Sequence, residues 1–182
     1  MKRNKKKIII NGKEVTATLE FVEEKDRAKL RKLFDDWKNL SNRIKKFSGK
    51  RGLNIPEGIT EAAFALELQY PKLIKLSKGK KFDNYNLKRK ERLQIKASSN
   101  SKSPSSFGPS SVSDVTYYLD FDRGGRLDGS FDCYRIPNKK IASMRVSRKQ
   151  NVGQQRGQKR RPRFPIMEII KKNKIKKKTY SI

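Results

Sequence analysis

The segment from Lys81 to Ser99 constrains the fold more than any other stretch, because its two short extended runs predict neighbouring strands of a sheet. Asp83 stands at the start of the first run, and the tripeptide Gln94-Ile95-Lys96 lies within the second. Alternate residues of a strand share a face, so the side chains of Gln94 and Lys96 are predicted to point the same way. This spacing can place an aspartate and a lysine side by side at the open end of a sheet.

The composition indicates one folded and strongly cationic domain. A chain of 182 residues can bury a real core but is too short for two comfortable domains. Hydrophobic residues make up 34% of the chain and gather in periodic segments, which argues against wholesale disorder. The 47 Lys and Arg residues outnumber the 18 Asp and Glu residues and leave a formal charge of +29, which predicts a polyanionic partner. A lysine-rich solvated surface without a partner is the alternative.

Several classes of protein are excluded by what the sequence lacks. It contains no histidine and a single cysteine, Cys133, so a zinc finger, a Ser-His-Asp triad and a Cys-His dyad are ruled out. Cys133 lies in an apolar strand pattern, where we expect a small buried hydrophobe. No apolar run approaches the roughly 18 to 20 residues that span a bilayer, so we expect a soluble, cytoplasmic protein. An enzyme of this composition would use carboxylates, lysine, hydroxyl groups or a metal held by oxygen.

The first third of the chain predicts a hairpin followed by two helices. The dipeptide Asn11-Gly12 favours a tight turn between two extended runs, which form a peripheral hairpin. A basic loop separates a long first helix from a second helix, which opens at Pro56 and stops before Pro71. From Glu23 to Phe47, apolar residues at intervals of three and four predict one face of the long helix: Leu30, Leu33, Phe34, Trp37, Leu40, Ile44 and Phe47.

The second half predicts further strands and a basic carboxyl-terminal segment. Strands are expected at 92–97, 116–121 and 130–136, whereas the serine-rich stretch 98–113 predicts a flexible loop. A short helix is expected at 137–144. Beyond it the chain is expected to be loop-like and very basic, with one apolar run at 164–170 and a solvated tail at 171–178.

Hydrolysis of a phosphodiester is the chemistry that these residue types suit best. The transition state adds negative charge beside an already anionic phosphate, and a divalent metal held by oxygen with a nearby lysine offsets that charge without histidine. Asp83 supplies a hard carboxylate oxygen, and Lys96 can lie over the phosphate and the attacking water. The backbone carbonyl of Ile95, between Gln94 and Lys96, is available as a further metal ligand.

Asp83 followed by Gln94-Ile95-Lys96, after a helix that carries acids, resembles the PD-(D/E)xK nuclease core in the variant with glutamine in place of the second acid. With their flanks, these residues resemble a group of small type II restriction endonucleases that cut short, GC-rich, interrupted palindromes, over about residues 54–164. The resemblance implies an α/β fold with a restriction-endonuclease-like core, in which helices flank a mixed β-sheet. The flanking motifs are Pro56-Glu57-Gly58-Ile59-Thr60-Glu61-Ala62, Lys96-Ala97-Ser98-Ser99, Ser106-Phe107-Gly108-Pro109, Tyr118-Leu119-Asp120-Phe121, Asp128-Gly129-Ser130-Phe131-Asp132 and Arg160-Arg161-Pro162-Arg163-Phe164.

The same resemblance implies roles for individual residues. Asp83 would bind Mg²⁺, Lys96 would orient or polarise the water, and Glu61 would approach the metal from the helix. Gln94 would be a neutral and weaker ligand, so Glu61 would have to make up the missing charge. A charged rim on an ordinary sheet is the alternative for these residues. Glu67, six positions beyond Glu61, lies on another face of the helix and is expected to be solvated.

The resemblance also divides the single domain 1–182 into functional parts. These are a peripheral hairpin at 1–22, a long helix and loop at 23–53, a catalytic core at 54–144, and a basic DNA-recognition segment and tail at 145–182. Ser98 and Ser99 either hold a phosphate oxygen or end their strand. Arginine can pair with guanine in the major groove, and non-specific clamping of the backbone is the alternative for each candidate. The DNA-binding candidates in the last segment are Arg145, Arg148, Gln154, Gln155, Arg156, Arg160, Arg161 and Arg163.

These observations lead to the hypothesis of a Mg²⁺-dependent endonuclease that cuts both strands of double-stranded DNA at a short palindrome. A palindromic site calls for a two-fold homodimer, and a restriction enzyme calls for a cognate DNA methyltransferase as its genetic partner. Two alternatives stay open at this point: a basic nucleic-acid-binding protein without catalysis, and a structure-specific repair nuclease on the same fold. The first of these would bind DNA in a salt-dependent way that ignores Asp83.

Overall fold

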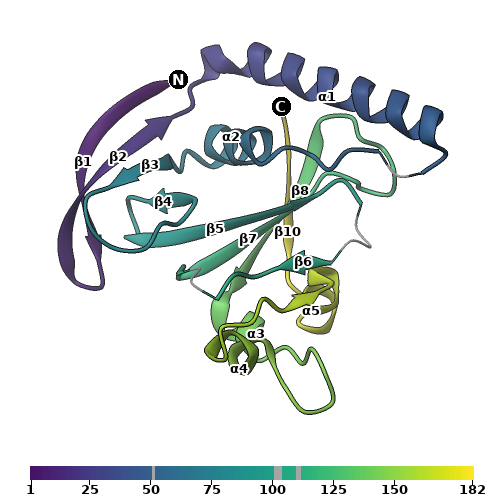
Figure 1. Cartoon of the computed structure of the whole chain (residues 1–182). Helices are drawn as coiled ribbons and strands as arrows, with labels where there is room; N and C mark the ends of the chain where they lie inside the picture. The colour runs from purple at the N-terminus through teal and green to yellow at the C-terminus, as the bar shows by residue number, and fades with distance from the viewer. Residues whose placement is uncertain (51, 101–103, 110–111) are drawn as a thin grey trace.

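The fold centres on an eight-stranded mixed sheet, seen in the computed structural model of the chain, which describes residues 1–50, 52–100, 104–109 and 112–182 (Figure 1). Parts of the predicted serine-rich loop, at 101–103 and 110–111, lie outside these residues. The strand order is β1-β2-β3-β4-β5-β7-β8-β10, and only the β5–β7 pair is parallel. The strands are β1 (Lys2–Ile10), β2 (Lys13–Phe21), β3 (Lys72–Leu76), β4 (Asn84–Asn86), β5 (Glu91–Ser98), β7 (Val115–Asp120), β8 (Ser130–Pro137) and β10 (Lys177–Ser181).

Helices cover both faces of this sheet, as the predicted α/β fold requires. The faces follow from strand alternation: Tyr117 and Leu119 of β7 pack toward α1 and α2, whereas Tyr118 packs toward the opposite layer. That opposite layer consists of the short helices and of β6 (Ser105–Ser106) paired with β9 (Arg163–Phe164). The helices are η1 (Glu24–Asp26), α1 (Arg27–Ser48), α2 (Glu57–Leu68), α3 (Asn138–Ala142), α4 (Val152–Gly157) and α5 (Ile166–Lys172).

The predicted amino-terminal hairpin is part of the main sheet. Asn11 and Gly12 have positive φ angles of 50° and 77°, as a tight turn between twisted strands requires. Strand β2 then pairs with β3, so the hairpin extends the edge of the sheet. The edge strand β1 is rich in lysine, which discourages pairing with the sheet of another molecule.

Helix α1 buries only part of its predicted apolar face. Leu30, Phe34 and Trp37 are buried against the sheet and α2, as the periodicity predicted. Leu33 and Leu40 are about half exposed, at 48% and 47%, and Phe47 is 94% exposed. The expectation of one continuous buried face was therefore wrong for its carboxyl-terminal part, which extends beyond the body of the protein (Figure 1).

The carboxyl-terminal segment is more ordered than the sequence predicted. Residues 152–157 form helix α4, and the last two residues of the predicted tail 171–178, Lys177 and Lys178, begin strand β10, antiparallel to β8. The residues of that tail other than Ile175 are exposed, as predicted. Lys177 Nζ donates to Asp132 Oδ2 at 2.6 Å, and Thr179 Oγ1 donates to Oδ1 of the same carboxylate at 2.7 Å. The buried carboxylate of Asp132 on β8 thus holds the lysine-rich strand β10 against the sheet.

Two smaller predictions also have clear outcomes. Cys133 is buried in the core, as expected, and burial raises the pKa of its thiol to about 12. In the part of the chain that the structure describes, no helix is long and apolar enough to cross a membrane.

We expect Asp132→Asn to lower the free energy of unfolding by about 1–3 kcal/mol at neutral pH, because Lys177 and Thr179 lose a charged acceptor. Burial tends to raise the pKa of Asp132, but the hydrogen bonds from Lys177 and Thr179 outweigh it and hold that pKa below its usual range. The carboxylate therefore stabilises the fold above its unfolded-state pKa, and this contribution is lost as the pH falls through the lower folded-state value. Urea unfolding of both proteins at neutral and acid pH measures the effect.

The matched control is Asp35→Asn, which removes a half-exposed ion pair with Arg31 on α1. Because exposed pairs contribute little, this change should cost less than about 0.5 kcal/mol. Equal stabilities of Asp132→Asn and the unaltered protein at neutral pH would contradict the prediction.

Candidate active site

The backbone of Asp83 is hydrogen-bonded to the two neighbouring strands, β3 and β5. Its backbone N–H donates to the carbonyl of Leu93 on β5 at 3.0 Å, and its own carbonyl accepts from the N–H of Leu73 on β3 at 2.8 Å. The side chain then turns toward β5, where Oδ2 accepts from Gln94 Nε2 at 2.5 Å and from the backbone N–H of Ile95 at 2.7 Å. The structure therefore joins Asp83 to the tripeptide that the sequence placed beside it.

Lys96 lies on the face of β5 that points toward β6. Its Nζ lies 5.7 Å from the ring centroid of Phe107, which is buried and stacks on Phe164 of β9 with 5.3 Å between the ring centroids. The favourable interaction of an ammonium with a ring face helps to fix a long and flexible side chain. Phe107 comes from the segment predicted to be a flexible loop, so part of that segment forms one wall of the site.

Helix α2 brings Glu61 to the same region, as predicted. Its Oε2 accepts an ion-pair contact from Lys72 Nζ of β3 at 3.2 Å, and both side chains are largely shielded from solvent. Glu67 faces elsewhere and pairs with Arg27 at 2.7 Å. Its side chain is only 14% exposed, so the expectation that it is solvated was wrong.

Glu57 and Lys72 are site residues that the sequence reasoning missed. Glu57 lies one helical turn before Glu61 and lines the same cavity. The signal was present in the sequence, because positions i and i+4 of a helix share a face. Lys72 gave no such signal, since its place beside Glu61 depends on the pairing of β3 with β4.

The electrostatics of the site favour a cation. Burial raises the pKa of Asp83, while the N–H of Ile95 and the charge of Lys96 act in the opposite direction. Burial also raises the pKa of Glu61, the negative charge of Asp83 adds to this effect, and Lys72 opposes it. Two partly desolvated carboxylates that repel each other are stabilised by any positive charge that enters between them.

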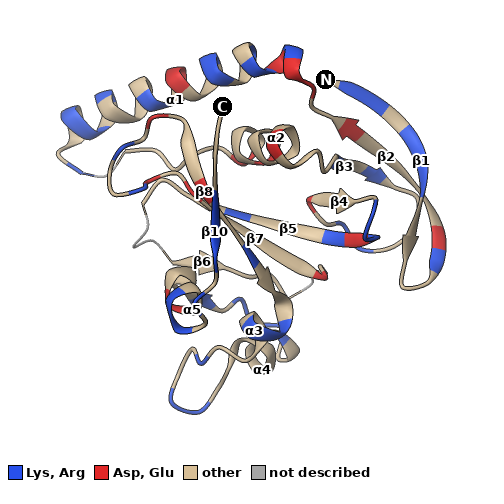
Figure 2. Ribbon diagram, turned by 180° about the vertical axis from the view of Figure 1, so that it is seen from behind, with Lys and Arg blue, Asp and Glu red and all other residues tan. Residues whose placement is uncertain are grey.

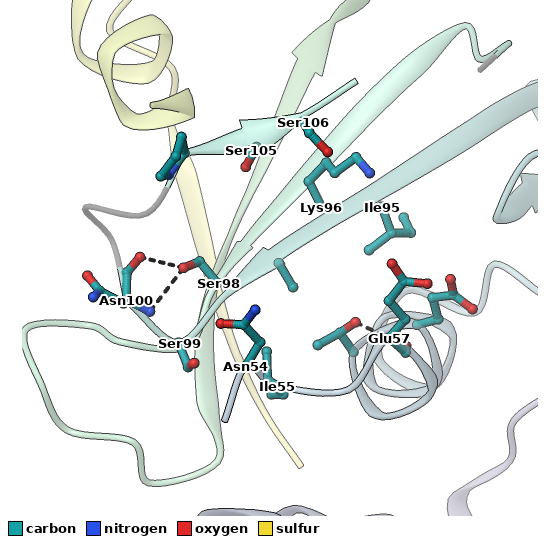
Figure 3. Close-up of a pocket in the computed structure, with 14 residues that line it drawn as sticks. Asn54, Ile55, Glu57, Ile95, Lys96, Ser98, Ser99, Asn100, Ser105 and Ser106 are labelled. Atoms are coloured by element: carbon teal, nitrogen blue, oxygen red, sulfur yellow. Dashed lines mark hydrogen bonds between the residues drawn. The ribbon is translucent and has the colours of Figure 1, made fainter. Parts of the chain in front are cut away.

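A cavity of about 280 Å³ opens between α2, the end of β5 and the segment that contains β6 (Figure 3). In Figure 3, Glu57 approaches from the helix, while Lys96 and Ser106 lie on the opposite side. Its lining residues are Asn54, Ile55, Glu57, Thr60, Glu61, Ile95, Lys96, Ala97, Ser98, Ser99, Asn100, Pro104, Ser105 and Ser106.

The donor set fits Mg²⁺ only if other oxygens complete it. Among the residues that the structure describes, no three His, Cys, Asp or Glu side chains form a ready-made metal site. Mg²⁺ is commonly held by one or two carboxylates together with waters and substrate phosphates, and it prefers oxygen throughout. Asp83 and Glu61, with the neutral oxygens of Gln94 and Ile95, match that incomplete set.

The two serines at the end of β5 differ in their surroundings. Ser98 is buried, its Oγ donates to the carbonyl of Asn100, and it accepts from the N–H of Asn100 at 3.0 Å. These contacts close the end of the strand. Ser99 is half-buried and lines the cavity, so it is the better placed of the two for a phosphate oxygen.

The predicted DNA-binding residues fall into two groups. Arg163 lies on β9 and pairs in register with Ser106, which lines the cavity, and the exposed Arg160 and Arg161 precede it. The second group lies around α4 and does not line the cavity: Arg145, Arg148, Gln154, Gln155 and Arg156. Arg163 is thus the candidate that strand pairing places next to the cavity.

Comparison with known proteins identifies the family. The family model described as Bsp6I restriction endonuclease matches residues 22–173, a span that includes the whole cavity. The type II restriction enzyme Bsp6I from Bacillus sp. (strain RFL6) is 33% identical to this chain over 137 residues, which cover 74% of each protein. No solved structure matches. The chain therefore belongs to the Bsp6I restriction endonuclease family, which confirms the type II restriction endonuclease that the sequence motifs resembled.

Proposed function

We propose that this protein is a Mg²⁺-dependent enzyme that cleaves both strands of double-stranded DNA at a short palindromic site, in defence against foreign DNA. The observation that carries this proposal is the hydrogen bonding of Asp83 to Gln94 and Ile95, with Lys96 on the next residue of β5 and Glu61 across the cavity. Family membership supports site-specific cleavage of DNA. The formal charge of +29 supports tight binding to a polyanion.

In this proposal each residue acts on the phosphodiester in a defined way. Asp83 and Glu61 would hold Mg²⁺, with the carbonyl oxygen of Ile95 and the amide oxygen of Gln94 as neutral ligands. The ion supplies positive charge and Lewis acidity at the phosphate when bound. Lys96 would orient the attacking water and donate to the phosphate as negative charge develops. Lys72 would hold Glu61 in position by their ion pair.

The proposal extends to partners. A palindrome presents the same half-site on each strand, so a homodimer would place one cavity on each scissile bond. The arginines of β9 and of the preceding turn would grip phosphates next to the cavity, and Ser99 would contact the scissile phosphate. A DNA methyltransferase of matching specificity would protect the host DNA, and its gene is expected beside this one.

We expect Asp83→Ala and Lys96→Ala each to reduce cleavage of plasmid DNA with Mg²⁺ by at least about 100-fold, since each removes a group that acts on the transition state. Binding of the same DNA in the absence of metal should largely survive both changes, because each removes one charge from a protein with 47 Lys and Arg residues. Gel analysis of fragments and a metal-free binding assay separate the two effects. Discrete fragments produced by Asp83→Ala at the unaltered rate would overturn the proposed function.

We expect Glu61→Gln to raise the Mg²⁺ concentration needed for half-maximal cleavage, because one of two anionic ligands becomes neutral. Glu67→Gln is the matched control: it lies on the same helix and also loses an ion pair, but it faces Arg27 and not the cavity. Metal titrations of cleavage and calorimetric titrations of Mg²⁺ binding both report the change. Identical metal dependence of the two variants would contradict a role for Glu61 in metal binding.

The homodimer is tested by sedimentation with a short duplex that contains the cleavage site. We expect two chains per duplex, and conversion of supercoiled plasmid to linear DNA with little nicked intermediate, because both cavities act in one binding event. One chain per duplex and accumulation of nicked circles would show that the subunits act singly.

A further inference from the structure

We infer that the hairpin loop from Arg145 to Asn151 reads bases of the recognition site through the guanidinium of Arg148. This inference rests on the proposed function and assigns it a specificity-determining residue. The loop projects from the body of the protein beyond α3 and α4 (Figure 1), and Figure 2 shows basic residues along it. Four observations support the assignment: the closure of the loop, its anchoring, the use of its other polar side chains, and its charge.

The loop is a closed hairpin held by its own backbone. Arg145 and Asn151 form a bridge at its base, and the carbonyl of Gln150 accepts from the N–H groups of Val146 and Ser147 at 3.0 and 3.2 Å. Ser147 Oγ also accepts from the N–H of Gln150 at 3.1 Å. The tip at Ser147, Arg148 and Lys149 is therefore set in one conformation before any ligand binds.

The base of the hairpin is anchored in the core. Val152 is fully buried and packs in the cluster that contains Ile141, with Met144 and Val146 partly buried against it. Its N–H donates to the carbonyl of Met144 at 2.9 Å. At Gly153 a Cβ would lie only 3.3 Å from the carbonyl oxygen of Ala142, so glycine allows this close approach of α4 to α3. A hairpin with such a base can hold its tip at a fixed distance from the body.

The glutamines and Arg145 make hydrogen bonds within the hairpin and to α4. Gln154 and Asn151 cap the start of α4 reciprocally, with bonds of 2.9 and 2.8 Å. The side chain of Gln150 donates to Gln158 at 3.1 Å and accepts from Gln155 at 3.3 Å. Arg145 Nη1 donates to the carbonyl of Arg148 at 3.1 Å.

Arg148 and Lys149 are the exposed residues at the tip that remain. Their side chains make no hydrogen bond or ion pair with residues 1–50, 52–100, 104–109 or 112–182 for which the structure gives a position. The sequence has no Asp or Glu between Asp132 and Glu168, and eleven Lys and Arg residues fall in that interval. The tip thus presents two cations in a stretch of sequence without acids, and Glu168, the acid that ends this stretch, shares a pocket with Arg145 at the base of the hairpin.

Arginine at the end of a rigid hairpin suits the edge of a guanine. Its planar guanidinium offers two parallel donors to O6 and N7, whereas lysine offers a single charged centre. A pre-formed loop loses little conformational freedom when it enters a groove. Arg163 of β9, by contrast, pairs with Ser106 at the cavity where the scissile phosphate would be held, which suits it to a backbone contact.

The test compares affinities without cleavage. The site is first defined by sequencing the ends of fragments cut by the unaltered protein. Binding is then measured in the absence of metal, at several salt concentrations, to the cognate duplex and to duplexes with one base pair changed. We expect Arg148→Ala to lower the ratio of cognate to altered-site affinity by roughly 5- to 150-fold at one base-pair position. Arg148→Lys should not restore that ratio, because it keeps the charge but not the paired donors.

The controls separate a base contact from a phosphate contact and from misfolding. Lys149→Ala should weaken binding to all duplexes alike and reduce the slope of log affinity against log salt by about 1. A thermal unfolding midpoint equal to that of the unaltered protein shows that each exposed substitution leaves the fold intact. An unchanged affinity ratio for Arg148→Ala, or an equal loss on all duplexes, overturns the inference. Loss of cleavage by Asp83→Ala remains a separate result, so failure of this inference would leave the proposed function standing.

Discussion

The position of the Asp83 carboxylate depends on two N–H groups of β5, and the rest of the candidate site is arranged around it. Gln94 and Ile95 both donate to Oδ2, at 2.5 and 2.7 Å. Burial raises the pKa of Asp83 above its ordinary value, and these donors and the nearby Lys96 limit that rise. Gln94 has a physical role that a glutamate in its place could not fill. A carboxylate so close to Asp83 would repel it, whereas an amide N–H supports it.

The two faces of strand β5 have different roles: one packs in the core, and the other carries a candidate catalytic residue. Leu93 and Ile95 of β5 are buried in the core formed with α1 and α2, while Lys96, on the alternate face, lies over Phe107. Phe107 is held in turn by Phe164 and by the pairing of β6 with β9. The lysine is therefore placed by two layers of structure that are far apart in the sequence. Helix α2 contributes Glu57 and Glu61 from the opposite side of the cavity.

The sequence predicted the parts of this structure that local patterns determine. Alternation placed Gln94 and Lys96 on one face of their strand, intervals of three and four identified α1, and Pro56 and Pro71 bounded α2. Long-range pairing explains most of the rest. Serine-rich composition predicted a flexible loop, but Ser105 and Ser106 pair with β9, more than fifty residues away. Lysine-rich composition predicted a solvated tail, which is mostly exposed, but Lys177 near its end is held in strand β10 by Asp132. Periodicity also cannot tell whether another part of the protein covers a helix face. Phe47 fits the apolar pattern of α1 and is nevertheless 94% exposed.

The distribution of charge connects the fold to the chemistry of the site. The chain is cationic over most of its length, yet Glu57 and Glu61 line one cavity, and Asp83 lies beside it, bonded to Ile95 of its lining. Lys72 pairs with Glu61, and Lys96 is the basic neighbour of Asp83. The described residues alone do not complete a metal site. A DNA phosphate would add the hard oxygens that Mg²⁺ needs and would itself be drawn to the cationic surface. On the proposed function, the DNA that the positive charge of the protein attracts therefore also supplies the oxygen ligands that the metal ion needs besides Asp83 and Glu61. A cavity with few acidic side chains is then sufficient for metal-dependent chemistry.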